Sequence, residues 1–74
     1  MQIVIRFYEC EHEGDVSRYA EGVITAGGSI LSESFDEESG SGRVVAEVDS
    51  LEAFKKRLHD TGGDDFVSGM WVKK

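Results

Sequence analysis

The residues of this chain that could do chemistry are concentrated between positions 9 and 15, where Cys10 and His12 stand among acidic residues. A cysteine and a histidine two residues apart could be two metal ligands, or a nucleophile and its general base. A structural zinc site needs four ligands, and no second cluster of Cys or His occurs in the chain. No neighbouring residue is a clear orienting group for the histidine. We therefore predict a solvated loop, with no metal site, no cofactor and no catalytic residues.

Three glycine-containing segments also lack the features of phosphate-binding loops. A Walker motif needs a Lys followed by Ser or Thr after its last glycine, and a dinucleotide fingerprint needs three spaced glycines between a strand and a helix. Gly27-Gly28 and Gly62-Gly63 instead follow helical patterns, and Gly40-Ser41-Gly42 joins two strand patterns, so we interpret them as helix ends and a turn. The acidic run from 36 to 38 lacks the alternate spacing of a calcium loop, and we interpret it as a solvated turn.

Charge is the strongest feature of the composition. Fifteen Asp and Glu against eight Lys and Arg give a net charge of −7 in 74 residues. Direct binding to nucleic acid is not expected, because that affinity depends largely on Lys and Arg that neutralise phosphates. No apolar run approaches the roughly 20 residues that cross a bilayer, and the single cysteine excludes an intramolecular disulfide. These features favour a cytoplasmic protein without membrane contacts, whose partner has a basic surface.

Hydrophobic spacing predicts one strand and one helix in the first third of the chain. Residues 2–8 alternate, and we expect the side chains of Ile3, Ile5 and Phe7 to enter the core. Asp15 is the expected N-cap of a helix that ends at Gly27-Gly28. Its apolar stripe is expected to consist of Val16, Tyr19, Ala20, Val23 and Ile24.

The rest of the chain predicts a hairpin, a helix and a final strand. Residues 29–35 and 43–48 read as two strands joined by a polar turn. Either Asp49 or Ser50 caps a second helix, whose apolar stripe contains Leu51, Phe54 and Leu58. A last strand over residues 65–72 is expected to bury Phe66, Met70 and Val72.

The order strand, helix, strand, strand, helix, strand predicts an α+β ferredoxin-like domain spanning residues 1–74, with two helices on one face of a four-stranded antiparallel sheet. The opposite face is then open and apolar, which predicts a homodimer or a contact with a different protein. Either Leu31 and Phe35 or Ile30 would join that face. Its expected members are Val4, Tyr8, Val45, Val67 and Trp71.

The segment Glu13-Gly14-Asp15-Val16, the helix that follows it, and Gly27-Gly28-Ser29-Ile30 leading into a strand resemble the corresponding parts of an ACT domain. The resemblance implies a ferredoxin-like fold and a dimer that senses a small ligand, often an amino acid. The implied ligand-binding positions are Glu11 or Glu13 with Gly14 in the first loop, and Gly28, Ser29 and Ile30 at the second strand.

The leading prediction is a non-enzymatic interaction module that binds and regulates a basic partner protein through acidic side chains. A sharper version is a small inhibitor of the kind that phages encode against nucleic-acid enzymes, including CRISPR complexes. The alternative is the ACT-like ligand-sensing dimer. Because the fold need not place the two acidic loops at the same end, we expect two separate patches. Their members are Glu9, Glu11, Glu13 and Asp15 before the first helix, and Asp36, Glu37 and Glu38 in the hairpin turn.

Overall fold

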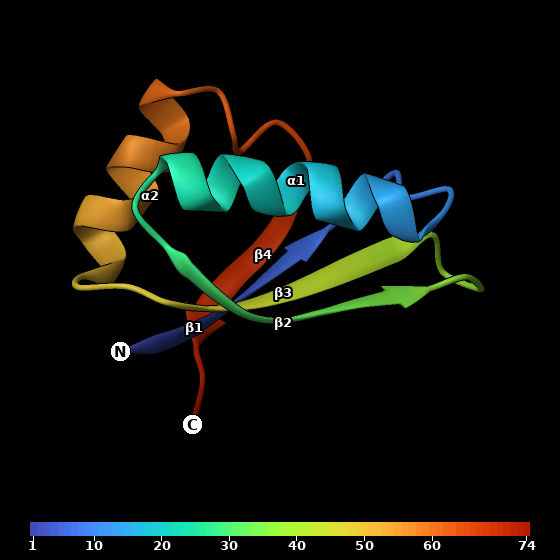
Figure 1. Ribbon diagram of the computed structural model, residues 1–74, viewed down its shortest axis with the longest axis horizontal. Helices are drawn as coiled ribbons and strands as arrows, with labels where there is room; N and C mark the ends of the chain where they lie inside the picture. Colours follow the sequence, from blue (N-terminus) through green and yellow to red (C-terminus); the bar gives the residue numbers. More distant parts are fainter.

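The computed structural model describes residues 1–74 and contains a four-stranded antiparallel sheet covered on one face by two helices (Figure 1). The strand order is β2-β3-β1-β4, so β2 and β4 are the edges. This arrangement confirms the predicted α+β ferredoxin-like fold. The elements are β1 (Gln2–Phe7), α1 (Glu13–Thr25), β2 (Ser29–Asp36), β3 (Ser41–Glu47), α2 (Leu51–Asp60) and β4 (Val67–Val72).

The core lies between the sheet and the helices, where β1 and β3 supply alternate side chains. Ile3, Ile5 and Phe7 are completely buried, as their alternation predicts. Phe54 and Leu58 of α2 are also completely buried. The expected burial of Ile24 is wrong, because its side chain is 56% exposed. Helix α1 faces the sheet through Val16, Ala20 and Val23, Tyr19 packs partly buried against the same core as expected, and Ala26 is buried at the C-cap.

A capping serine begins α2, and glycines end both helices. Ser50, one of the two expected caps of α2, accepts a hydrogen bond from the Ala53 backbone N–H at 3.4 Å. After α1, Gly27 has a φ of +97°, and after α2, Gly62 has a φ of +76°. Glycine adopts this left-handed conformation without the steric cost that a Cβ would add. Neither helix has the length and the hydrophobicity that a membrane-spanning helix requires.

A bulge in β2 reverses the alternation of its side chains. The register against β3 shifts between Ile30 and Ser32, and both Ile30 and Phe35 pack against the core. Residues five apart in a regular strand would point to opposite faces, so only the bulge allows both to face the helices. Neither expected alternative for the open face is therefore correct. Leu31, in the bulge, is 52% exposed.

The pairing of β1 with β4 contains a second register shift, between Arg6 and Phe7. This shift places Val67 opposite Phe7. Val67 consequently packs against the core on the helix side, not on the open face. Phe66 and Met70 are partly buried against the same core. Val72 is 41% exposed, so its expected burial is wrong, since it lies at the end of an edge strand.

Candidate functional site

The two acidic loops meet at one end of the molecule. The backbone N–H of Cys10 donates a hydrogen bond to the carbonyl of Gly40 at 2.9 Å. The loops are brought together because Phe7, the last residue of β1, is paired with Gly42 near the start of β3. In Figure 1 the loop before α1 and the β2–β3 turn lie at the same end of the sheet. The expectation of two separate acidic patches is therefore wrong.

We call this surface the acidic end. All of its carboxylate side chains belong to exposed residues. One of them also shapes the turn, because the Asp36 carboxylate accepts a hydrogen bond from the Glu38 backbone N–H at 3.1 Å. The acidic end consists of Glu9, Glu11, Glu13, Asp36, Glu37 and Glu38.

Asp15 does not belong to this surface, although it stands among the same acidic residues in the sequence. It lies in the first turn of α1, is only 7% exposed, and accepts the backbone N–H groups of Glu11 at 2.8 Å and His12 at 3.4 Å. It also pairs with Arg18. The N-cap of α1 is His12, so the expectation that Asp15 is the N-cap is wrong. The hydrogen bond from Glu11 is the main cause that lowers the pKa of Asp15. Asp15 therefore holds the loop in place and is not available to a partner.

The Cys10 thiol is buried beneath the same loop. It is 4% exposed, and its Sγ lies 3.1 Å from the position that a Cβ on Gly42 would occupy. Burial, with a smaller effect of the Asp15 charge, raises the pKa of this thiol, which disfavours the nucleophilic thiolate. His12 is exposed, so the two side chains do not share a reaction site. No group of three or more Cys, His, Asp or Glu residues is arranged to hold a metal ion.

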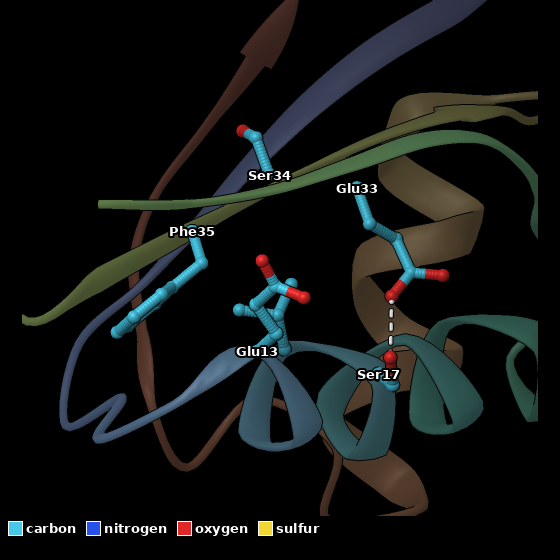
Figure 2. Close-up of a pocket in the computed structure, with 6 residues that line it drawn as sticks. Glu13, Ser17, Glu33, Ser34 and Phe35 are labelled. Atoms are coloured by element: carbon cyan, nitrogen blue, oxygen red, sulfur yellow. Dashed lines mark hydrogen bonds between the residues drawn. The ribbon is translucent and has the colours of Figure 1, made fainter. Parts of the chain in front are cut away.

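A groove between α1 and β2 continues the acidic end along the molecule (Figure 2). The carboxylates of Glu13 and Glu33 enter it from opposite walls, and the Ser17 hydroxyl donates to Glu33 Oε1 at 3.0 Å. Val16 and Phe35 supply its apolar lining. Two carboxylates above an aliphatic and an aromatic surface are suited to a Lys or Arg side chain, which has a long apolar stem and a cationic tip.

Glu33 was not among the residues predicted from the sequence, because its direction depends on the bulge in β2. Glu33 is opposite Val44, which is completely buried on the helix side of β3. The signal that could have revealed this direction is the pair Ile30 and Phe35, two large apolar residues at an odd spacing in one strand. Such a spacing requires a bulge if both are to be buried.

The positions that the ACT resemblance implies are not brought together within one chain. Gly14 is in the first turn of α1 and Gly28 follows its last turn, so a helix of 13 residues, about 20 Å long, separates them. Gly28 has a packing role, because a Cβ there would lie 2.8 Å from Val23 Cγ1. Ile30 is part of the core packing, whereas Ser29 is exposed. A ligand that contacted both ends would need a second chain.

Three of the five residues expected on the open sheet face lie together there. Val4 is paired with Val45 on one side and with Trp71 on the other. Val67 faces the helices instead. Tyr8 lies beyond the end of β1, where its hydroxyl donates to the Asp65 carbonyl at 3.0 Å and its ring packs edge-on against Phe66.

No family model matches this chain, and no curated protein matches its sequence. The crystal structure of SCO4226 from Streptomyces coelicolor A3(2) has a similar fold, with a TM-score of 0.71. The similarity covers 99% of this chain and 95% of that chain at 10% sequence identity. At this identity, the similarity supports the ferredoxin-like fold and carries no functional assignment.

Proposed function

We propose that this protein is a non-enzymatic module that binds, through its acidic end, a basic surface of another protein and so regulates it. The observation that carries the proposal is the hydrogen bond between Cys10 and Gly40, which joins two acidic loops into one surface. A surface with one sign of charge attracts the opposite charge over several ångströms and increases the rate of encounter.

The groove between α1 and β2 supplies specificity to this surface. A Lys or Arg of the partner would place its charged group between Glu13 and Glu33, and its aliphatic stem would lie along Phe35. Arginine is the better fit, because its planar guanidinium can donate to two carboxylates at once. Charge on the loops attracts many basic proteins, whereas the groove selects those that present a protruding cation.

A partner surface that normally binds the phosphates of nucleic acid carries the positive charge that the acidic end would attract. Carboxylates at the acidic end would compete with those phosphates for the same Lys and Arg side chains. In its most specific form, we propose that this protein inhibits a nucleic-acid-binding enzyme. In that form, the partner loses affinity for nucleic acid while this protein is bound.

The proposal can be tested by affinity capture with two charge-matched variants. Glu11→Lys/Glu37→Lys/Glu38→Lys changes the acidic end, and Glu21→Lys/Glu52→Lys/Asp60→Lys changes three exposed acidic residues elsewhere by the same net charge. Tagged protein is incubated with a lysate of the organism that encodes it, and the captured proteins are quantified by mass spectrometry. We expect a basic protein that is captured by the wild type and the second variant but not by the first. Equal capture by both variants, or equal loss, contradicts the proposal.

A further inference from the structure

The open face of the sheet is organised in rows that run across the strands. The pairing of β1 with β3 places Arg6 opposite Arg43, Val4 opposite Val45, and Gln2 opposite Glu47. In each strand these residues alternate with the core residues that face the helices, so their side chains lie on the opposite face of the sheet. We call the three sets the arginine row, the apolar row and the glutamate row. The arginine row comprises Ser34, Arg43 and Arg6; the apolar row Val45, Val4 and Trp71, with Ser32 beside Val45; and the glutamate row Ser29, Glu47 and Gln2, beside which the Lys73 backbone N–H bonds to the Gln2 carbonyl.

The apolar row lies between the two charged rows. Trp71, at its end on β4, is 42% exposed, although tryptophan is usually buried to a large extent. Val45 is half-buried, and Val4 between them is only 6% exposed. An exposed indole beside two β-branched side chains, on a face that no helix covers, is typical of an interface.

The arginine row is expected to destabilise the fold of an isolated chain. Arg6 and Arg43 are directly opposite one another, and like charges in such positions destabilise a pair of strands. Neither guanidinium has an acidic partner within the chain, which contains fifteen Asp and Glu. On the other side of the apolar row, the Glu47 carboxylate is 51% exposed and contacts only the terminal ammonium of Met1, at 3.1 Å.

We propose that a second copy of this chain docks on the open face, sheet against sheet, about a two-fold axis that runs along the apolar row. In this arrangement Arg43 of each copy lies against Glu47 of the other, and Arg6 lies against Gln2. Val45, Val4 and Trp71 of the two copies form the centre of the contact. The interface is isologous, so each charge complementarity occurs twice.

The charges select this axis over the other one that would stack the two sheets. A two-fold axis parallel to the strands superimposes each row on the same row of the second copy, so the arginines would face arginines. An axis across the strands exchanges the two charged rows and brings unlike charges together. Stacked sheets pack about 10 Å apart at roughly 30°, a geometry that leaves Arg43 and Glu47 within reach of each other.

The size of the face sets the strength of the dimer. A face of four strands about 4.8 Å apart and six to eight residues long covers on the order of 300–400 Å², below the roughly 800 Å² per partner of a standard interface. Each copy also carries a net charge of −7, which opposes association at low salt. We therefore expect a dissociation constant in the micromolar range that does not rise when salt is added.

The test is a charge exchange followed by sedimentation velocity. The variants are Arg43→Glu, Glu47→Arg and the double variant Arg43→Glu/Glu47→Arg. Each single variant places like charges at both symmetric contacts, so we expect dissociation constants at least about tenfold above the wild type. The double variant restores unlike charges and is expected to recover the dimer. An equimolar mixture of the two single variants is expected to form heterodimers, because both symmetric contacts then pair a carboxylate with a guanidinium.

Three controls show whether a weaker dimer results from the lost charge pairs. Circular dichroism shows whether each variant is folded, and Glu47→Gln removes the ion pair with the Met1 ammonium without adding a positive charge. Trp71→Ser is expected to abolish the dimer by removing the centre of the contact. A monomeric wild type at about 100 µM, far above a micromolar dissociation constant, would overturn the proposal, and so would a folded double variant that fails to recover. Glu11→Lys/Glu37→Lys/Glu38→Lys leaves all three rows intact, so it is expected to dimerise whether or not it binds another protein.

Discussion

The indole ring of Trp71 lies over Gly69, two residues earlier in the same strand. A Cβ on Gly69 would be 3.0 Å from Cζ3 of the ring, closer than a normal contact. Gly69 has an ordinary backbone conformation, so the space that the ring occupies, and not the backbone, favours glycine here. The ring therefore occupies the space above Gly69, and Trp71 is paired with Val4, which is 6% exposed.

Substitution of Gly69 by alanine is expected to move this ring. The new methyl group displaces the indole, and the emission of the single tryptophan should change in wavelength or intensity. The free energy of unfolding should change by less than about 1 kcal/mol, because the lost contact is offset by a less flexible unfolded chain. Tryptophan fluorescence and urea denaturation measure the two effects. An unchanged emission spectrum in a folded variant would show that the ring does not lie over Gly69.

Gly42 is expected to be far less tolerant of alanine. A Cβ there would lie 2.5 Å from Val16 Cγ2 and 3.1 Å from the Cys10 thiol, both buried beneath the acidic end. Overpacking of this kind costs about 1–3 kcal/mol. In a double-mutant cycle with Val16→Ala, which removes the nearest atoms, the effect of Gly42→Ala should be smaller. Equal effects of Gly42→Ala in both backgrounds would contradict this contact.

The carboxylate of Asp15 is expected to stabilise the acidic end in a pH-dependent way. The pKa of Asp15 is lowered in the folded state, mainly by the hydrogen bond from the Glu11 backbone N–H. Its contribution is therefore complete above the ordinary pKa of about 3.9 and is lost as the pH falls through the lower folded value. Asp15→Asn should lower the melting temperature at pH 7 and have a smaller effect at pH 2. A difference in melting temperature that does not depend on pH would contradict this role.

His59 is expected to make stability depend on pH in the opposite direction to Asp15. Its Nδ1 lies 2.9 Å from an Asp64 carboxylate oxygen, and this hydrogen bond is the main cause that raises the pKa of His59. The stabilisation is complete below the unfolded pKa of about 6.5 and is lost as the pH rises through the folded value. NMR titration of Asp64→Asn should show a lower pKa for His59 than in the wild type. Asp60→Asn is the matched control and should have a smaller effect, whereas equal shifts would rule out the hydrogen bond as the main cause.

The sequence predicts the order of the elements and most of the core because periodicity reports directly on burial. The alternation of Ile3, Ile5 and Phe7, and the helical spacing of Phe54 and Leu58, each correspond to a completely buried set of side chains. Periodicity fails at the two register shifts. There Ile30 with Phe35, and Val67 on β4, face the helices against the expected alternation.

The sequence predicts the acidic end only in part, because the two loops that form it are brought together by a long-range strand pairing. The carboxylates of the two loops are evident in the sequence, but their proximity follows from Phe7 opposite Gly42 and from the hydrogen bond between Cys10 and Gly40. The different role of Asp15 was also hidden. An acidic residue just before an apolar stripe matches an N-cap, whereas in the structure it follows the true N-cap, His12, by three positions.

We propose that charge on the acidic end guides a basic partner to this protein. The most direct test is the association rate constant of the captured partner, measured by stopped-flow at low and high salt for the wild type and the two charge-matched triple variants. Complementary charges act mainly on encounter, so the wild type should associate rapidly at low salt and more slowly at high salt. Glu11→Lys/Glu37→Lys/Glu38→Lys should associate at least about tenfold more slowly at low salt, with little salt dependence. Glu21→Lys/Glu52→Lys/Asp60→Lys should stay close to the wild type. Equal rates for both variants across the salt range would contradict the claim that the acidic end is the docking surface.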